Sequence, residues 1–398
     1  MTGFLAKFVS FALSIITSAA MLFAPVTQGI NLTSNAFAES FGQIAYDENR
    51  LVPTEDADGW VFNTDRPLKV VQLTDIHIGG GLLSKSFDRK AMNAVAAMLS
   101  YEKPDLVVLT GDMVYPVPFQ GGTLNNEVST RLLINLLETL GVYYAPLFGN
   151  HDTESYSTHT RDQIGDIWSS DELEYSLFKK GPEDIDGVGN YIIKVKNSQG
   201  IVKNALFCID SNDYSKDDLL GLGGNYDNIH ENQIEWYKAK VNEIHAANTA
   251  LNPSEPMFTS LAFFHIPLEE FGIAWEEYKA NGNTENVKYI SGEHRERTCS
   301  SPVSDNFFET VQELGSTKAI FCGHDHVNNG TIEYKGVKLV YGMSIDYIAY
   351  VTPITNLVGY QRGCTVISVN ESEIEVSHEN YYQDKYESKY CKEAVAMN

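Results

Sequence analysis

Cysteine is scarce in this sequence. Five cysteines are spread over 398 residues, and no two of them form a Cys-x-x-Cys pair. This spacing argues against zinc sites built from cysteine. An odd number of cysteines also leaves at least one thiol outside any intramolecular disulfide.

Positive charge is scarce too. The chain has 29 lysine and arginine residues against 53 aspartate and glutamate residues, which gives a formal net charge of -24. Such an excess of negative charge argues against a nucleic-acid polymer or an anionic membrane surface as a partner. An acidic chain that acts on phosphates needs a local cationic centre, and bound metal ions would supply one.

Long apolar runs are missing except near the N-terminus. One run extends from Phe8 to Ala24, follows a lysine and ends at Pro25, and a small-x-small sequence closes at Ala38. This pattern predicts that residues 1–38 are a signal peptide, and that the mature protein is secreted, periplasmic or on the cell surface. An uncleaved anchor is the alternative, but the run is shorter than most membrane-spanning helices. No stable membrane span is expected after cleavage.

The rest of the chain shows apolar strands that alternate with amphipathic helices. The first such strand begins at Leu68, and we predict an α/β fold in which polar residues at the strand ends build the functional site. We expect an N-terminal extension over 39–66, one catalytic domain over 67–379 and a polar, poorly ordered tail over 380–398. No internal repeat or low-complexity linker divides the domain.

Five stretches end predicted strands with side chains that are able to bind metal. A single Asp-x-His or strand-end histidine is usually a surface turn or a structural group. Five in order, each closing a strand, indicate a metal centre, and the glycines before three of them leave room for metal and substrate. Carboxylate, imidazole and amide donors suit Fe, Zn or Mn better than calcium. The five stretches are Asp75-Ile76-His77, Gly111-Asp112, Gly149-Asn150-His151-Asp152, His265 and Gly323-His324-Asp325-His326.

The same segments carry a resemblance. The set TDIH, GDMVY, GNHD, FFHIP and GHDH resembles the calcineurin-like metallophosphoesterase superfamily, from Leu68 to Val369. The longer segments LKVVQLTDIHIG, FFHIPLEEF and FCGHDHVNN are similar to its branch of purple acid phosphatase 29 and Dcr2-like proteins. The resemblance implies a four-layer α-β-β-α sandwich with a dinuclear metal site at the C-terminal ends of the strands.

The resemblance also implies roles for individual residues. His151 would donate a proton to the leaving oxygen or stabilise developing charge. Asp152 would orient the imidazole of His151, although a strand-end cap explains an aspartate here equally well. The implied ligands are Asp75, His77 and His326 for the first metal, Asp112 as the bridge, and Asn150, His265 and His324 for the second.

One departure from the family concerns Tyr115. Purple acid phosphatases place a tyrosine ligand three residues after the bridging aspartate, and Tyr115 reproduces that spacing after Asp112. Those enzymes lack a histidine in the first motif, whereas this chain has His77. We favour His77 as the ligand and Tyr115 as a wall of the pocket.

The expected function is hydrolysis of phosphate monoesters or diesters by a metal-bridged hydroxide, with two divalent or trivalent ions (Fe, Zn or Mn) as cofactors. A small phosphorylated compound or a phosphoprotein is the expected substrate, and no nucleic-acid polymer is expected. A nucleotidase or nuclease of the same superfamily is one alternative. A binding protein that keeps the fold without catalysis is the other.

Three further features remain open. Asp325 lies between two ligand histidines and is predicted to point away from the metals. Glu269 and Glu270 would shape substrate choice or begin a solvated helix. The segment from Tyr341 to Tyr350 would either wall the pocket or form an edge strand.

Overall fold

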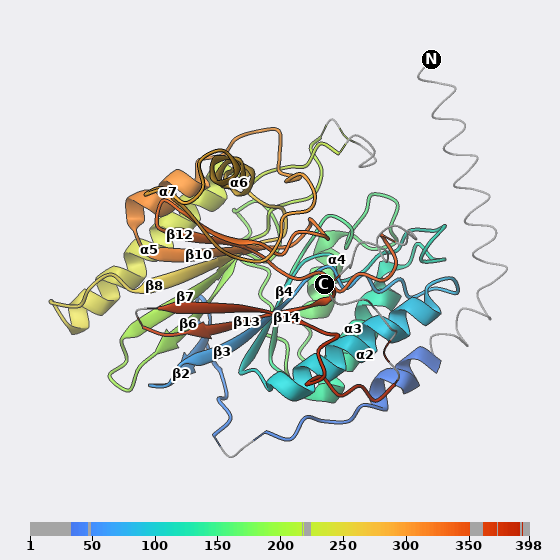
Figure 1. Ribbon diagram of the computed structural model, residues 1–398. Coiled ribbons are helices and arrows are strands. Elements are labelled where there is room, and N and C mark those ends of the chain that lie inside the picture. The colour runs from blue at the N-terminus through green and yellow to red at the C-terminus, as the bar shows by residue number, and fades with distance from the viewer. Residues whose placement is uncertain are drawn as a thin grey trace.

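A computed structural model describes residues 33–46, 49–216, 218, 224–350, 361–371, 373–390 and 392. Most of the predicted signal peptide (1–32) and Cys391 lie outside these residues. The described chain forms two β-sheets that face each other, with helices on their outer sides (Figure 1). The α/β prediction is therefore confirmed.

The smaller sheet has five strands. Strands β3, β4 and β5 are parallel to one another, and β13 pairs with β3 in the antiparallel sense. Val-rich β3 and β4 are buried along almost their whole length, as expected for strands covered on both faces. In spatial order the strands are β14 (Ile374–Asn380), β13 (Gly363–Val369), β3 (Leu68–Leu73), β4 (Leu106–Thr110) and β5 (Tyr144–Leu147).

The larger sheet has nine strands. Its centre, from β7 through β8 and β10 to β12, is parallel, and antiparallel pairs extend it on both sides. In spatial order the strands are β1 (Thr54–Asp56), β2 (Gly59–Asn63), β6 (Tyr191–Lys196), β7 (Val202–Cys208), β8 (Thr259–Phe263), β10 (Thr317–Cys322), β12 (Val337–Tyr341), β11 (Thr331–Tyr334) and β9 (Val287–Ser291).

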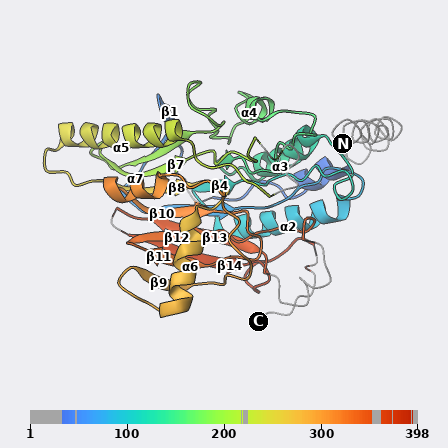
Figure 2. The same ribbon diagram turned by 90° about the horizontal axis from the view of Figure 1, so that it is seen from above.

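Helices cover the outer faces of the two sheets. In Figure 1, α5, α6 and α7 lie beyond the larger sheet and α2 and α3 beyond the smaller one. Helices α5 and α7 lie next to each other (Figure 2). The helices are α2 (Lys85–Glu102), α3 (Asn126–Leu140), α4 (Arg161–Trp168), α5 (Glu231–Leu251), α6 (Glu269–Asn281) and α7 (Phe307–Leu314).

Strand β10 shows how four layers arise from one sequence pattern. Ala319 and Phe321 face the core that the two sheets share, whereas Ile320 and Cys322 face the core under α5 and α7. Alternate side chains point to opposite faces of a strand, so a strand that is apolar at every position is covered on both sides. The larger sheet is therefore enclosed between helices and the second sheet, which gives the α-β-β-α order.

Both ends of the described chain pack on this sandwich. Phe37 and Ala38 are buried, and Phe37 contacts the ring of Tyr390 and the guanidinium of Arg89. The expectation of a poorly ordered tail is wrong for its described part, because Tyr381 and Tyr386 are about as buried as core residues. In the part of the chain that the structure describes, none of the helices has the length and hydropathy needed to cross a membrane.

Candidate metal centre

The candidate site lies where the two sheets meet at the C-terminal ends of their parallel strands. Strands β3, β4 and β5 of the smaller sheet and β8 and β10 of the larger one each end two or three residues before a predicted ligand. Backbone bonds join these ends, for example from the Asp75 amide to the Gly111 carbonyl and from the Gly323 amide to the His265 carbonyl. The five segments singled out in the sequence thus converge on one place.

The backbone at this place is unusual. Among the described residues, seven that are not glycine have a positive φ, and four of them are predicted ligands: Asp75, His77, Asp112 and His324. This conformation costs free energy for a residue with a Cβ, and such residues concentrate at functional sites. The turns that leave the strands are therefore set by the site rather than by local preference.

Glycines allow the converging loops to approach closely. A Cβ built at Gly149 would lie 2.2 Å from Oδ1 of Asp112, and one at Gly323 would lie 2.0 Å from Oγ1 of Thr74. Neither position tolerates a side chain unless a candidate ligand or the residue beside it moves. The space beside these glycines, which was predicted to be left for metal and substrate, is occupied by Asp112 and Thr74.

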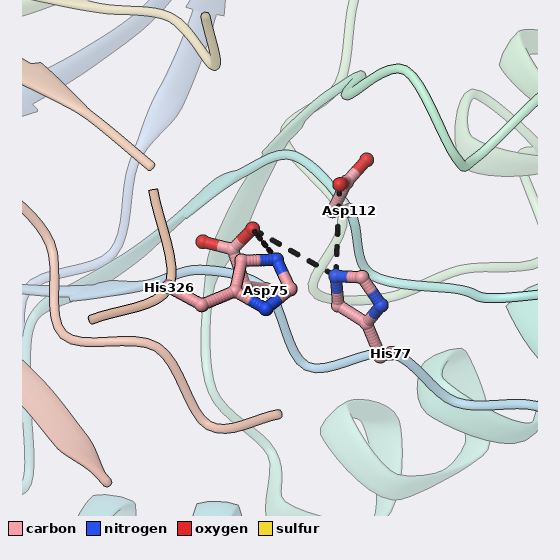
Figure 3. A group of neighbouring side chains, drawn as sticks. All are labelled: Asp75, His77, Asp112 and His326. Atoms are coloured by element: carbon pink, nitrogen blue, oxygen red, sulfur yellow. Dashed lines mark ion pairs between the residues drawn. The ribbon is translucent and has the colours of Figure 1, made fainter. Parts of the chain in front are cut away.

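A first group of donor atoms combines Asp75, His77, Asp112 and His326, and these atoms all lie within 4.8 Å of one another. Nε2 of His77 is 3.7 Å from Oδ1 of Asp75 and 3.6 Å from Oδ2 of Asp112. Nε2 of His326 is 3.3 Å from the same oxygen of Asp75. Figure 3 shows the four side chains pointing toward a common centre.

A second group combines Asp112, His265 and His324, again within 4.8 Å. Nε2 of His265 lies 3.2 Å from Oδ2 of Asp112 and 3.2 Å from Oδ1 of Asn150. The Asn150 amide donates to the hydroxyl of Tyr214, which turns its oxygen toward the group. One oxygen, Oδ2 of Asp112, thus faces both groups, which is the geometry of a bridging carboxylate.

Three donor atoms of the first group have no hydrogen-bond partner although they are buried. They are Oδ1 of Asp75, Nε2 of His77 and Oδ2 of Asp112. Buried polar atoms are costly when they are left unpaired, so their concentration at one point fits a bound ion. Two metal ions therefore suit the donors that this chain presents.

The pKa shifts of the histidines in the site agree with the binding of cations. Burial alone would lower the pKa of His77, but the carboxylates of Asp112 and Asp75 outweigh it and raise the pKa to about 9. The same balance raises the pKa of His265 to about 9. A cation that binds at these imidazoles therefore competes with the protons that the raised pKa favours.

His151 lies beside the first group without belonging to it. Its ring centroid is 5.6 Å from that of His77, and its side chain is 25% exposed, far more than the predicted ligands. Nδ1 of His151 lies 2.6 Å from Oε1 of Glu154, which also accepts a bond from Tyr214. No described residue bonds to Nε2 of His151, so this nitrogen is available to a substrate.

The predicted role of Asp152 is not supported. Its carboxylate accepts bonds from the backbone amides of Asp112, Gly149 and Val114, and not from the His151 ring. Asp152 therefore ties the loop after β4 to the loop after β5, as a strand-end cap does. The carboxylate that holds His151 is Glu154, three residues downstream, and no motif in the sequence points to it.

Tyr115 lies over the first group as a wall. Its ring is 4.9 Å from the rings of both His77 and His151, but its hydroxyl donates to Oε1 of Gln120. Burial and the negative charges of Asp346 and Asp112 raise the pKa of Tyr115, which opposes formation of a tyrosinate. His77, not Tyr115, lies within the first group of donors.

We therefore expect the protein loaded with iron to lack an intense tyrosinate charge-transfer band in the visible spectrum. An absorption spectrum of the iron-loaded protein checks this, with Tyr115→Phe as the matched variant. An intense band that disappears in Tyr115→Phe would contradict the assignment.

Asp325 faces away from both groups. Its carboxylate accepts a bond of 2.7 Å from the hydroxyl of Tyr341 and bonds from Asn328 and the Cys299 amide. Its neighbours His324 and His326 point to different groups of donors. Asp325 thus supports the loop that carries the two histidines.

Glu270 does not begin a solvated helix, because only 8% of the residue is exposed. Burial and the nearby negative charges of Glu309, Asp305 and Glu269 raise the pKa of Glu270 to about 7. Because the pKa of Glu270 is higher in the folded state than in the unfolded state, protonation of this carboxyl stabilises the fold. The contribution to stability is complete below the unfolded-state pKa and is lost as pH rises through about 7.

We expect Glu270→Gln to raise the melting temperature by several degrees at pH 8 and to leave it almost unchanged at pH 4.5. Thermal unfolding followed by circular dichroism at both pH values measures this. An equal effect at the two pH values would show that the ionised carboxylate is not the cause.

Comparison with known proteins agrees with the site. The model of the calcineurin-like phosphoesterase family matches residues 68–328. "Probable inactive purple acid phosphatase 14" of Arabidopsis thaliana is 30% identical over 77% of this chain and 76% of its own length. "Phosphatase DCR2" of Saccharomyces cerevisiae is 31% identical over 66% of this chain and 44% of its own length. A dimetal phosphatase structure from Danio rerio aligns with 80% of this chain and 98% of its own, with a TM-score of 0.48 and 12% identity.

Proposed function

Since the chain belongs to the calcineurin-like phosphoesterase family, we propose that it hydrolyses phosphate esters at a dinuclear metal centre. The observation that carries the proposal is the position of Asp112, whose Oδ2 faces both groups of donor atoms. A carboxylate in this position would be shared by two cations, which together would bind one phosphoryl group. Monoesters are the first substrates to test and diesters the second.

Seven residues of the chain would hold the ions. The donor set of carboxylates, imidazoles and one amide favours Fe, Zn or Mn over calcium. When bound, two such ions polarise a phosphoryl group and lower the pKa of an attacking water. The residues are Asp75, His77 and His326 at the first position, Asp112 between the two, and Asn150, His265 and His324 at the second.

His151 is proposed to give a proton to the leaving oxygen. Its Nδ1 is held by Glu154, which fixes the ring, while no described residue bonds to Nε2 and the side chain is 25% exposed. A donor in this position lowers the barrier because the leaving alkoxide or phenoxide is protonated as it departs. Tyr115 restricts the movement of the ring from one side.

The names of the relatives point in two directions. The Arabidopsis relative is called probably inactive and the yeast relative is called a phosphatase. This chain keeps every ligand predicted from its motifs and brings them into two groups. That completeness favours an active enzyme over a binding protein that has kept only the fold. The net charge of -24 favours small phosphorylated compounds or phosphoproteins over nucleic-acid polymers.

Metal analysis combined with hydrolysis assays tests the proposal. The purified protein, loaded with Zn, Mn or Fe, is expected to hold two ions per chain and to release phosphate from an aryl phosphate monoester. An aryl phosphate diester measured in parallel gives the preference between ester classes. Two bound ions without hydrolysis of either ester would favour the binding protein.

Export is proposed from the leader sequence, and the N-terminal packing makes its cleavage site testable. A mature chain that starts at Glu39 would lack Phe37, whose ring contacts Arg89 and Tyr390. N-terminal sequencing of the exported protein distinguishes cleavage after Ala38 from cleavage further upstream, which would keep these contacts.

A further inference from the structure

Asp346 is a buried carboxylate behind one of the metal ligands, and nothing in the motifs points to it. It lies in the loop after β12 and is 1% exposed. Its Oδ2 is 3.3 Å from Nδ1 of His326. We propose that Asp346 is a positioning residue that fixes the imidazole of His326 and thereby strengthens binding at the first metal position. The inference rests on the proposed dinuclear centre.

The two nitrogens of the His326 ring face different carboxylates. Nε2 points to Oδ1 of Asp75 and the first group, and Nδ1 points to Asp346. An imidazole that binds a metal through Nε2 carries its proton on Nδ1, so it needs an acceptor there. A carboxylate in that place selects the correct tautomer and makes the ring a stronger donor.

His265 provides a comparison within the same site. Its Nδ1 lies 2.8 Å from the backbone carbonyl of Thr110, a neutral acceptor, while its Nε2 faces the second group. His326 is the ligand histidine with a carboxylate behind it in the described site. Asp346 therefore adds a third carboxylate near the first position, after Asp75 and Asp112.

Asp346 is itself held rigidly. Its Oδ1 accepts bonds of 2.7 Å from the amides of Ile348 and Ala349, and its Oδ2 accepts one of 2.8 Å from the amide of Tyr350. Its carbonyl accepts a bond of 2.7 Å from the guanidinium of Arg362. A side chain fixed by so many donors has little freedom to turn away from His326.

The turn from Asp346 to Tyr350 also places an aromatic ring on His326. The ring of Tyr350 stacks on His326 with 4.2 Å between centroids and 28° between planes. Asp346 therefore accepts the hydrogen bond of Nδ1 of His326, and the turn that Asp346 organises covers the face of the ring. Oδ2 of Asp346 thus has two neighbours, the amide of Tyr350 within the turn and Nδ1 of the ligand.

The test measures binding of Zn²⁺ alone to the intact chain, by competition with a chelating indicator and by metal analysis. Asp346→Asn keeps an oxygen that accepts from Ile348 and Ala349 but places an amide donor against Nδ1 of His326. We expect one of two Zn²⁺ ions to bind about 10- to 100-fold more weakly and the other to keep its affinity. Asp346→Glu keeps the charge and is expected to recover part of the loss.

Asp305→Asn is the matched control, because Asp305 also accepts a backbone amide at a turn, that of Phe307, and has no bond to a ligand. It should bind both ions like the wild type. The inference fails if Asp346→Asn binds both ions with wild-type affinity, if Asp305→Asn loses as much, or if Asp346→Asn and Asp346→Glu are equally impaired. Since the measurement needs no substrate, a protein that binds two ions but hydrolyses no ester would overturn the proposed function and leave Asp346 in place. A wild-type protein that binds no Zn²⁺ would overturn both.

Discussion

Replacement of His151 by glutamine is expected to lower kcat for an aryl phosphate by about 10²- to 10⁴-fold, the range that a positioned proton donor contributes. The imidazole lies outside both groups of donor atoms, so the variant should keep two metal ions. Glutamine at 151 has an amide in place of the ring and cannot supply a proton to the leaving oxygen. Steady-state kinetics together with metal analysis of the same sample measure both expectations.

Two further variants show whether the effect belongs to the imidazole. Glu154→Gln removes the carboxylate at 2.6 Å from Nδ1 and should reduce kcat less than the loss of the ring itself. His159→Gln is the control, because His159 is also partly exposed and lies 3.3 Å from a glutamate, Glu127, away from the ligands. Its activity should equal that of the wild type. Full activity of His151→Gln with both ions bound would remove His151 from the mechanism.

Replacement of Asp112 by asparagine is expected to abolish stable binding of the two metal ions and to lower kcat/KM by at least about 10³-fold. Oδ2 of Asp112 lies 3.6 Å from Nε2 of His77 and 3.2 Å from Nε2 of His265, so one change weakens both positions. Asparagine keeps the oxygen that accepts from the His151 amide, so the loops should remain in place. Metal content and hydrolysis are measured on the same preparation.

Asp105→Asn controls for the loss of a buried carboxylate as such. Asp105 is 7% exposed and pairs with Arg66 at the opposite end of the parallel strands. Its substitution should lower the free energy of unfolding and leave the metal content unchanged. An Asp112→Asn protein that retains two tightly bound ions would show that Asp112 does not bridge them.

The strands and the ligands that follow them were predictable because two independent patterns occur together: an apolar run, and metal-binding residues soon after it. Runs such as Leu106 to Leu109 in β4 are apolar at every position, and glycine and aspartate follow shortly after, at Gly111 and Asp112. Only the family resemblance predicts which ligands share a metal, since spacing does not reveal which of His324 and His326 faces which carboxylate.

The residues that support the ligands were harder to predict, for physical reasons. Asp152 and Glu154 are both acidic neighbours of His151, and only the path of the loop decides that Glu154 reaches the ring. Asp346 comes from a loop twenty residues after its partner, and the sequence does not encode their contact locally. Glu270 reads as a solvated helix start, but neighbouring elements cover it. In each case tertiary packing overrides a sound local expectation.

The division of the ligands between the two sheets has a consequence for how the protein acquires metal. Asp75, His77, Asp112 and Asn150 follow strands of the smaller sheet, whereas His265, His324 and His326 follow strands of the larger one. The second position is complete only after residue 324 has been synthesised, the first only after residue 326, and both only after the two sheets have docked. Loading of the two ions would therefore be a late step that follows folding of both sheets.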